Sequence, residues 1–150
     1  MSVSATLLSD ELLLQDLRIA LKLDDKDAVY SGRYPRPVRR PFEVWVETAA
    51  ARPLSNFSHS DQHPYRVHIR TDLNNLGADQ TGAVSLETVK GHMATIRDRF
   101  DGILNTAETK FLDRLPGLMC WTAEEESVDE DPVDAGVLDG VVILAATVRR

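Results

Sequence analysis

The sequence predicts an α+β fold in a single domain, with a mainly antiparallel sheet of about four strands. Two segments alternate apolar and polar residues with a period of two, which is typical of half-buried strands. A later segment repeats its apolar residues every three to four positions, which is typical of one helix face. The length of 150 residues suits one domain, and a hydrophobic content of 43% supports a core.

Two helices are expected to pack on this sheet. The first runs from about Asp10 to Leu23, where Ser9 can cap its start and apolar residues recur at helical spacing. The second is long and amphipathic and runs from Ser85 to about Asn105. Its apolar face consists of Leu86, Val89, Met93, Ile96, Phe100 and Ile103. A short helical piece is expected from Thr106 to Leu115, before Pro116.

Four segments are expected to form the strands. Phe42 to Thr48 and Tyr65 to Arg70 alternate cleanly, and Leu118 to Thr122 is a shorter candidate. Val137 to Val148 is apolar on both faces, which indicates a central strand or one covered by a helix and a partner. The predicted order is therefore α-β-β-α-β-β, with the last two strands forming a hairpin.

Long loops are expected near residues 24–41, 49–64 and 123–136. Prolines crowd the first of them, and the third contains the run EEESVDEDPVD, which has seven acids and no base over residues 124–134. A run of one charge is normally solvated. Loops of this length are uncommon in compact domains and often become ordered on a partner.

The overall charge restricts the class of partner. The formal net charge is −7, so general binding to nucleic-acid phosphates is disfavoured, although DNA could pass along an acidic surface. No signal peptide and no membrane span are evident, so assembly in the cytoplasm and no membrane partner are expected. The single cysteine, Cys120, lies in an apolar segment and is expected to be a buried thiol in a reducing compartment.

No motif for catalysis, metal binding or phosphate binding is present. The sequence lacks a serine nucleophile elbow and a glycine-rich phosphate loop. Its histidines lack the spacing and support of a zinc site, and surface or interface positions are expected for His59, His63, His68 and His92. We therefore expect no catalytic residue, no cofactor and no metal, and a role in assembly rather than chemistry.

Charged segments and one tryptophan are the candidates for an interface. A basic segment of four arginines can meet the acidic run of a neighbouring subunit, and such a head-to-tail contact can close into a ring. Strand alternation places Trp45 opposite Val44 and Val46, where it would be exposed unless the first helix covers that face. The interface candidates are Arg33, Arg36, Arg39, Arg40, Trp45, Glu124, Glu125, Glu126, Asp129, Glu130 and Asp131.

The order of these segments resembles that of tail terminator, or tail completion, proteins of long-tailed bacteriophages and gene transfer agents. An N-terminal helix is followed by the proline-rich YPRPVRRPF, the strands EVWVE and YRVHIR, the long helix from Ser85 and the final GVVILAATVRR. The resemblance covers roughly Leu12 to Arg150 and includes no catalytic motif.

This resemblance implies a virion structural protein of the tail or neck. Such proteins are small subunits of a hexameric ring that caps the tail tube, stops its polymerisation and joins it to the head connector. The expected partners are further copies of the chain, the tail tube protein and the head–tail connector protein, with DNA only as passing cargo. Residues 124–134 would then face solvent, at the lumen or on a ring face.

Two alternatives stay open. The chain could be a different neck or connector subunit. It could instead be a small cytoplasmic ligand-binding or enzymatic α/β domain, with a pocket between sheet and helices where Arg66, His68 and Arg70 converge on an anionic ligand. A DNA-binding module is disfavoured by the charge and the lack of a basic helix face.

Overall fold

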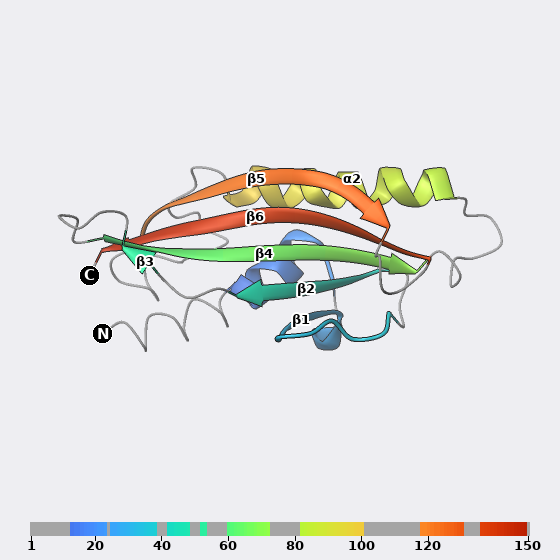
Figure 1. The fold of residues 1–150 in the computed structure, drawn as a ribbon, viewed down its shortest axis with the longest axis horizontal. Helices are drawn as coiled ribbons and strands as arrows, with labels where there is room; N and C mark the ends of the chain where they lie inside the picture. The colour runs from blue at the N-terminus through green and yellow to red at the C-terminus, as the bar shows by residue number, and fades with distance from the viewer. Residues whose placement is uncertain are drawn as a thin grey trace.

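The computed structural model describes residues 13–23, 25–38, 42–48, 52–53, 60–72, 82–100, 118–130 and 136–149. Residues 13–20 form an N-terminal helix, and Gly82–Phe100 form the long helix α2. A 3-10 turn, η1, covers Lys26–Ala28. The strands are β1 (Val29–Ser31), β2 (Glu43–Thr48), β3 (Arg52–Pro53), β4 (Ser60–Asp72), β5 (Leu118–Glu130) and β6 (Val137–Arg149) (Figure 1).

The strands form one mixed sheet in the order β1-β2-β4-β6-β5, with β3 paired to β4 outside this path. The pairings are antiparallel except for β1 and β2, which are parallel. The ladder between β4 and β6 extends from Ser60 opposite Arg149 to Asp72 opposite Val137. As the apolar sequence of β6 indicated, this strand is central and lies between β4 and β5.

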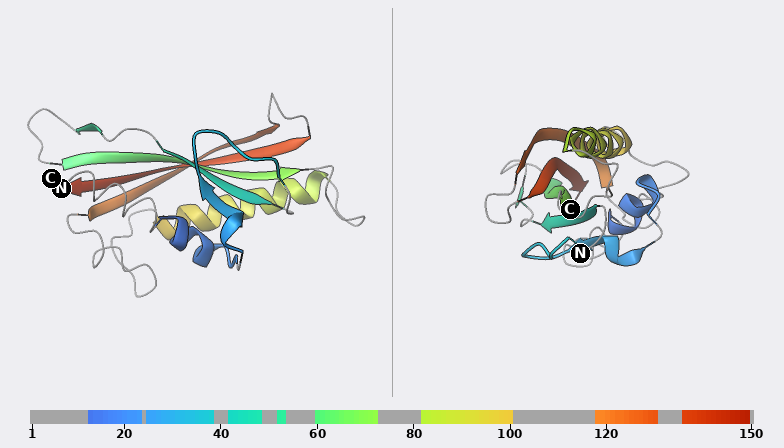
Figure 2. Two further views of the ribbon diagram at one scale, coloured as in Figure 1. Left: turned by 90° about the horizontal axis from the view of Figure 1, so that it is seen from below. Right: turned by 90° about the vertical axis from the view of Figure 1, so that its right-hand side faces the viewer.

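Both helices lie on the same face of the sheet and enclose the core there (Figure 2). The α2 residues Val89, Met93, Ile96 and Phe100 are buried, as the three-to-four spacing predicted. Leu13, Leu17 and Leu21 of the N-terminal segment join the same cluster. The sheet contributes Val44, Val46, Tyr65, Val67, Ile69, Trp121, Val142, Leu144 and Ala146. We call this side of the sheet the helix-covered face.

The α+β fold and the pairing of long antiparallel strands are confirmed, but the sheet is larger than predicted. β1 lies within the loop expected over 24–41, and β3 and the start of β4 lie within the loop expected over 49–64. The prediction of an irregular acidic loop is wrong for residues 123–130, because β5 continues to Glu130 along β6. Its backbone hydrogen-bonds to β6 while acidic side chains extend into solvent, so a charged run is compatible with an edge strand.

The close contact between α2 and β6 depends on Gly140. A Cβ atom at this position would lie 2.5 Å from Val89 Cγ1 and 2.7 Å from Met93 Sδ. We expect Gly140→Ala to lower the free energy of unfolding by about 1–3 kcal/mol, the usual cost of overpacking. Gly91, on the exposed side of α2, has no atom within 4 Å of a built Cβ. Gly91→Ala is therefore the matched control, and we expect it to raise stability by about 0.5–1 kcal/mol in urea titrations. Equal effects of the two substitutions would contradict this packing.

Candidate assembly surfaces

The face of the sheet opposite the helices is partly covered by residues 32–38, which we call the strap. The strap continues from β1 and passes over this second face before the chain enters β2 (Figure 2). Buried side chains fix both ends of the strap: Tyr30, just before it, is 5% exposed, and Val38, its last residue, is 7% exposed. The Tyr30 hydroxyl accepts a hydrogen bond from the Arg36 amide at 2.8 Å, and burial raises the pKa of the Tyr30 phenol. These contacts give the strap a defined path.

Trp45 lies on the second face, as the alternation of β2 predicted, but it is not exposed. Its side chain is 7% accessible, and its indole Nε1–H donates to the Gly32 carbonyl at 2.9 Å. The indole also stacks on the His68 ring with a centroid distance of 4.3 Å. The prediction of an exposed Trp45 is therefore wrong, because the strap closes over it. The sequence does contain a signal for this ordered segment, because the apolar residues Val29, Tyr30 and Val38 lie on either side of the exposed part of the strap.

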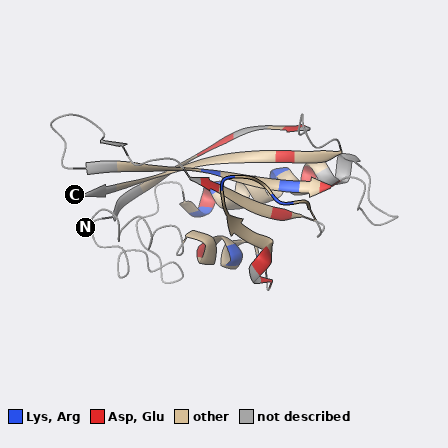
Figure 3. Cartoon of the chain, turned by 60° about the horizontal axis from the view of Figure 1, so that its bottom comes forward, with Lys and Arg blue, Asp and Glu red and all other residues tan. Residues whose placement is uncertain are grey.

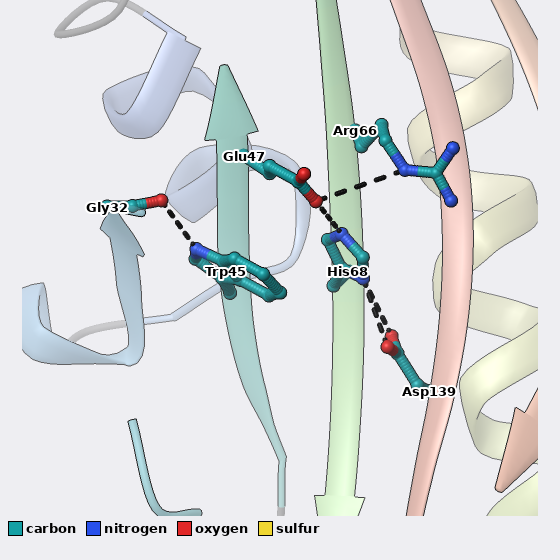
Figure 4. A network of polar contacts seen from close by, with 6 residues as sticks. All are labelled: Gly32, Trp45, Glu47, Arg66, His68 and Asp139. Carbon is teal, nitrogen blue, oxygen red and sulfur yellow. Dashed lines mark hydrogen bonds and ion pairs between the residues drawn. The ribbon is translucent and has the colours of Figure 1, made fainter. Parts of the chain in front are cut away.

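His68 forms the centre of a polar network on this face (Figure 4). Its Nδ1 lies 3.0 Å and 3.1 Å from the Asp139 carboxylate oxygens, and its Nε2 lies 3.0 Å from Glu47 Oε2. Arg66 Nε lies 3.9 Å from the same Glu47 oxygen. The expectation of a surface histidine is wrong for His68 and His63, which are each 6% exposed. The network joins β2, β4 and β6 next to Trp45, which bonds to Gly32 of the strap.

We expect His68→Phe to lower the free energy of unfolding by about 2 kcal/mol. Phenylalanine preserves a ring for Trp45 but removes both polar contacts, which leaves the largely buried Asp139 carboxylate without its imidazole partner. Glu47→Ala is the control, because the Glu47 side chain is 42% exposed and its ion pairs should contribute no more than about 1 kcal/mol. Chemical denaturation followed by tryptophan fluorescence measures both. A larger loss of stability for Glu47→Ala than for His68→Phe would contradict the expectation that the buried contacts of this network contribute most.

The described basic and acidic interface candidates lie at opposite edges of the sheet (Figure 3). Arg33 and Arg36 are exposed on the strap, next to the β1 edge. Glu124, Glu125 and Asp129 are exposed on the edge strand β5. Within the chain, Glu125 pairs with Arg97 of α2 at 2.8 Å rather than with an arginine of the strap. The two charged segments therefore lie apart on the sheet, at its two edges.

Some candidate residues are only partly placed by the structure. Arg39, Arg40 and Asp131 lie outside the described residues, as do His59 and the expected helical piece from Thr106 to Leu115. Glu126, Glu130 and Cys120 lie in β5, but their side chains are outside the description. The interface roles of Arg39, Arg40, Glu126, Glu130 and Asp131 stay predictions. So do the buried thiol of Cys120, the surface or interface position of His59 and the helical piece.

An open depression of about 420 Å³ lies on the second face towards the β5 edge. Pro64, Ile143 and Ala145 provide apolar surface, and Gln62, Thr122 and Glu124 provide polar groups; Ala123 completes the lining. The β4–β6 and β5–β6 registers bring these side chains together from three strands. Sequence reasoning missed this site because no short segment contains it.

The structure gives little support to an anion site at His68. Arg66, His68 and Arg70 do share one face of β4, but this face is opposite the helices rather than between sheet and helices. His68 already contacts two carboxylates, and Arg70 is 2% exposed. In the described part of the chain, no three His, Cys, Asp or Glu side chains are placed to hold a metal ion. Among the described helices, none is long and apolar enough to cross a bilayer.

Comparison with solved structures finds the same fold in a chain of a particle described as "Virion of native gene transfer agent (GTA) particle". The TM-score is 0.50 and the sequence identity is 14%. The match covers 89% of this chain and 84% of the virion chain. No protein-family model matches the sequence. No curated protein matches it either.

Proposed function

We propose that this protein is a virion structural subunit of a long-tailed phage or gene transfer agent. In this proposal it forms a ring, most simply a hexamer, at the head–tail junction. The ring caps the tail tube, ends its polymerisation and contacts the head connector. The observation that carries the proposal is the fold shared with a chain of the gene transfer agent virion over most of both chains.

The surfaces described above are consistent with assembly. Basic and acidic side chains are exposed at opposite edges of one sheet, which suits a contact between different patches of successive subunits. Both ring nitrogens of His68 are engaged with carboxylates, and this polar cluster joins neighbouring strands. An acidic β5 on a lumen or ring face would not retain passing DNA. We infer that the role is structural rather than enzymatic.

Tail-tube polymerisation in the presence of this protein tests the proposal. We expect substoichiometric protein to shorten the tubes and to be visible by electron microscopy as a ring at one tube end. Light scattering across protein concentration and salt should show a species near six subunits, either alone or on the tube. Binding to the head connector without an effect on the tube would instead indicate another neck subunit. Binding to neither component would refute the proposal.

A further inference from the structure

We propose that the strap of one copy of this chain docks into the β5-edge depression of a second copy. Tyr34 is the apolar anchor of this contact, and Arg33 and Arg36 face Glu124 of the neighbour. This inference rests on the proposed ring and specifies the contact between its subunits.

The strap presents an exposed aromatic group on an ordered support. Tyr34 is 73% exposed, the most of any large hydrophobic residue described. Arg33 lies 5.9 Å over its ring, and Arg36 lies 4.4 Å over the buried Tyr30 ring. Single exposed hydrophobic residues are common, so exposure alone proves nothing. Here, however, tyrosine and arginine, which predominate among binding hot spots, lie on a segment fixed by the Trp45–Gly32 hydrogen bond. These contacts reduce the backbone ordering entropy that docking of the strap would cost.

The depression has the matching chemistry. Its volume of about 420 Å³ lies within the ~300–1,000 Å³ range of cavities that accept organic groups. Pro64, Ile143 and Ala145 can contact an aromatic ring, while Gln62 and Thr122 can bond a phenol hydroxyl. Glu124 is exposed at this site, where it would meet an arginine that enters with the tyrosine. Charge and polarity thus complement each other between strap and depression.

The occupant is a second copy rather than the same chain. The strap continues from the edge strand β1 and covers Trp45 of β2, whereas the depression is lined by β4, β6 and the opposite edge strand β5. Within one chain Tyr34 is 73% exposed and does not fill the depression. In the proposed ring each copy places its strap in the depression of one neighbour and receives the strap of another, which is a heterologous contact. Such contacts close into rings when the rotation allows. A net charge of −7 also disfavours nucleic acid as the partner of this surface.

Cross-linking of mixed single-cysteine variants tests the contact directly. In a Cys120→Ser background, Pro35→Cys marks the strap and Thr122→Cys marks the depression; both native residues are exposed. We expect a short bis-maleimide to yield covalent dimers when the two variants are mixed, but not from either variant alone. Glu87→Cys, on the exposed side of α2, is the matched control for Thr122→Cys. Equal yields with Glu87→Cys, or dimers from Pro35→Cys alone, would overturn the heterologous contact.

Charge reversal provides a second measurement. We expect Arg33→Glu/Arg36→Glu, or Glu124→Arg, to weaken self-association by about tenfold or more, and the three changes combined to restore much of it. If rings persist in every charge variant and the strap–depression cross-link does not form, this contact is overturned while the proposed ring stands. A chain that stays monomeric with and without the tail tube, and gives no cross-link, would overturn both.

Discussion

Asp16→Ala should lower the free energy of unfolding by about 3 kcal/mol. Arg99 of α2 forms a two-pronged ion pair with Asp16 of the N-terminal helix, with Nε–Oδ2 and Nη2–Oδ1 distances of 2.7 Å and 2.6 Å. The Asp16 side chain is 4% exposed and the Arg99 side chain 13%. Removing the carboxylate would take two charge-assisted hydrogen bonds from a guanidinium that lies close to the core. This loss of unfolding free energy is at the lower end of the range for buried ion pairs that lose one partner, because Arg99 keeps some contact with water.

The controls separate this pair from simple packing. Asp16→Asn retains the shape but loses the charge, and we expect an intermediate loss of stability. The double variant Asp16→Leu/Arg99→Leu removes both charges and should lie much closer to wild type than Asp16→Ala, because apolar pairs often replace buried ion pairs at little cost. Urea titration of the four proteins gives the comparison. Wild-type stability for Asp16→Ala would mean that this pair does not fix the N-terminal helix to α2.

Hydrophobic periodicity predicted the parts of the fold that depend on local sequence. The stripe from Val89 to Phe100 identified α2, and the alternation around Val44 and Val67 identified two strands and their buried sides. Burial of these residues follows from a pattern contained within each segment. The apolar sequence of β6 likewise indicated a central strand, because only a strand covered on both sides tolerates it.

The features that sequence reasoning missed depend on contacts between distant segments. Alternation assigned Trp45 to the correct face of β2, but nothing local shows that Gly32 of the strap covers it. Glu124 to Glu130 form a strand because β6 supplies the backbone partners, and a charged edge strand is favourable since it resists pairing with other chains. The depression likewise exists only once β4, β5 and β6 are in register.

Trp121→Ala should have the largest effect on stability, with an expected loss of about 3–5 kcal/mol. Trp121 is 1% exposed on the helix-covered face of β5. Its ring lies edge-on to Phe100 of α2 at a centroid distance of 5.1 Å and is tilted towards Tyr65 of β4 at 6.0 Å. The side chain therefore fastens the edge strand to both the long helix and the middle of the sheet. Trp121→Phe preserves an aromatic ring beside Phe100, and we expect a distinctly smaller loss in thermal and urea denaturation.

The same substitution should also affect assembly, because Trp121 precedes two residues of the depression, Thr122 and Ala123. Loosening β5 would disorder the acceptor surface while leaving the strap, at the other edge of the sheet, unchanged. In mixed cross-linking at a temperature where the variant stays folded, Trp121→Ala in the depression-marked chain should lower the dimer yield. In the strap-marked chain it should have little effect. A loss of equal size in both chains would mean that the substitution acts through general instability rather than through the β5 surface.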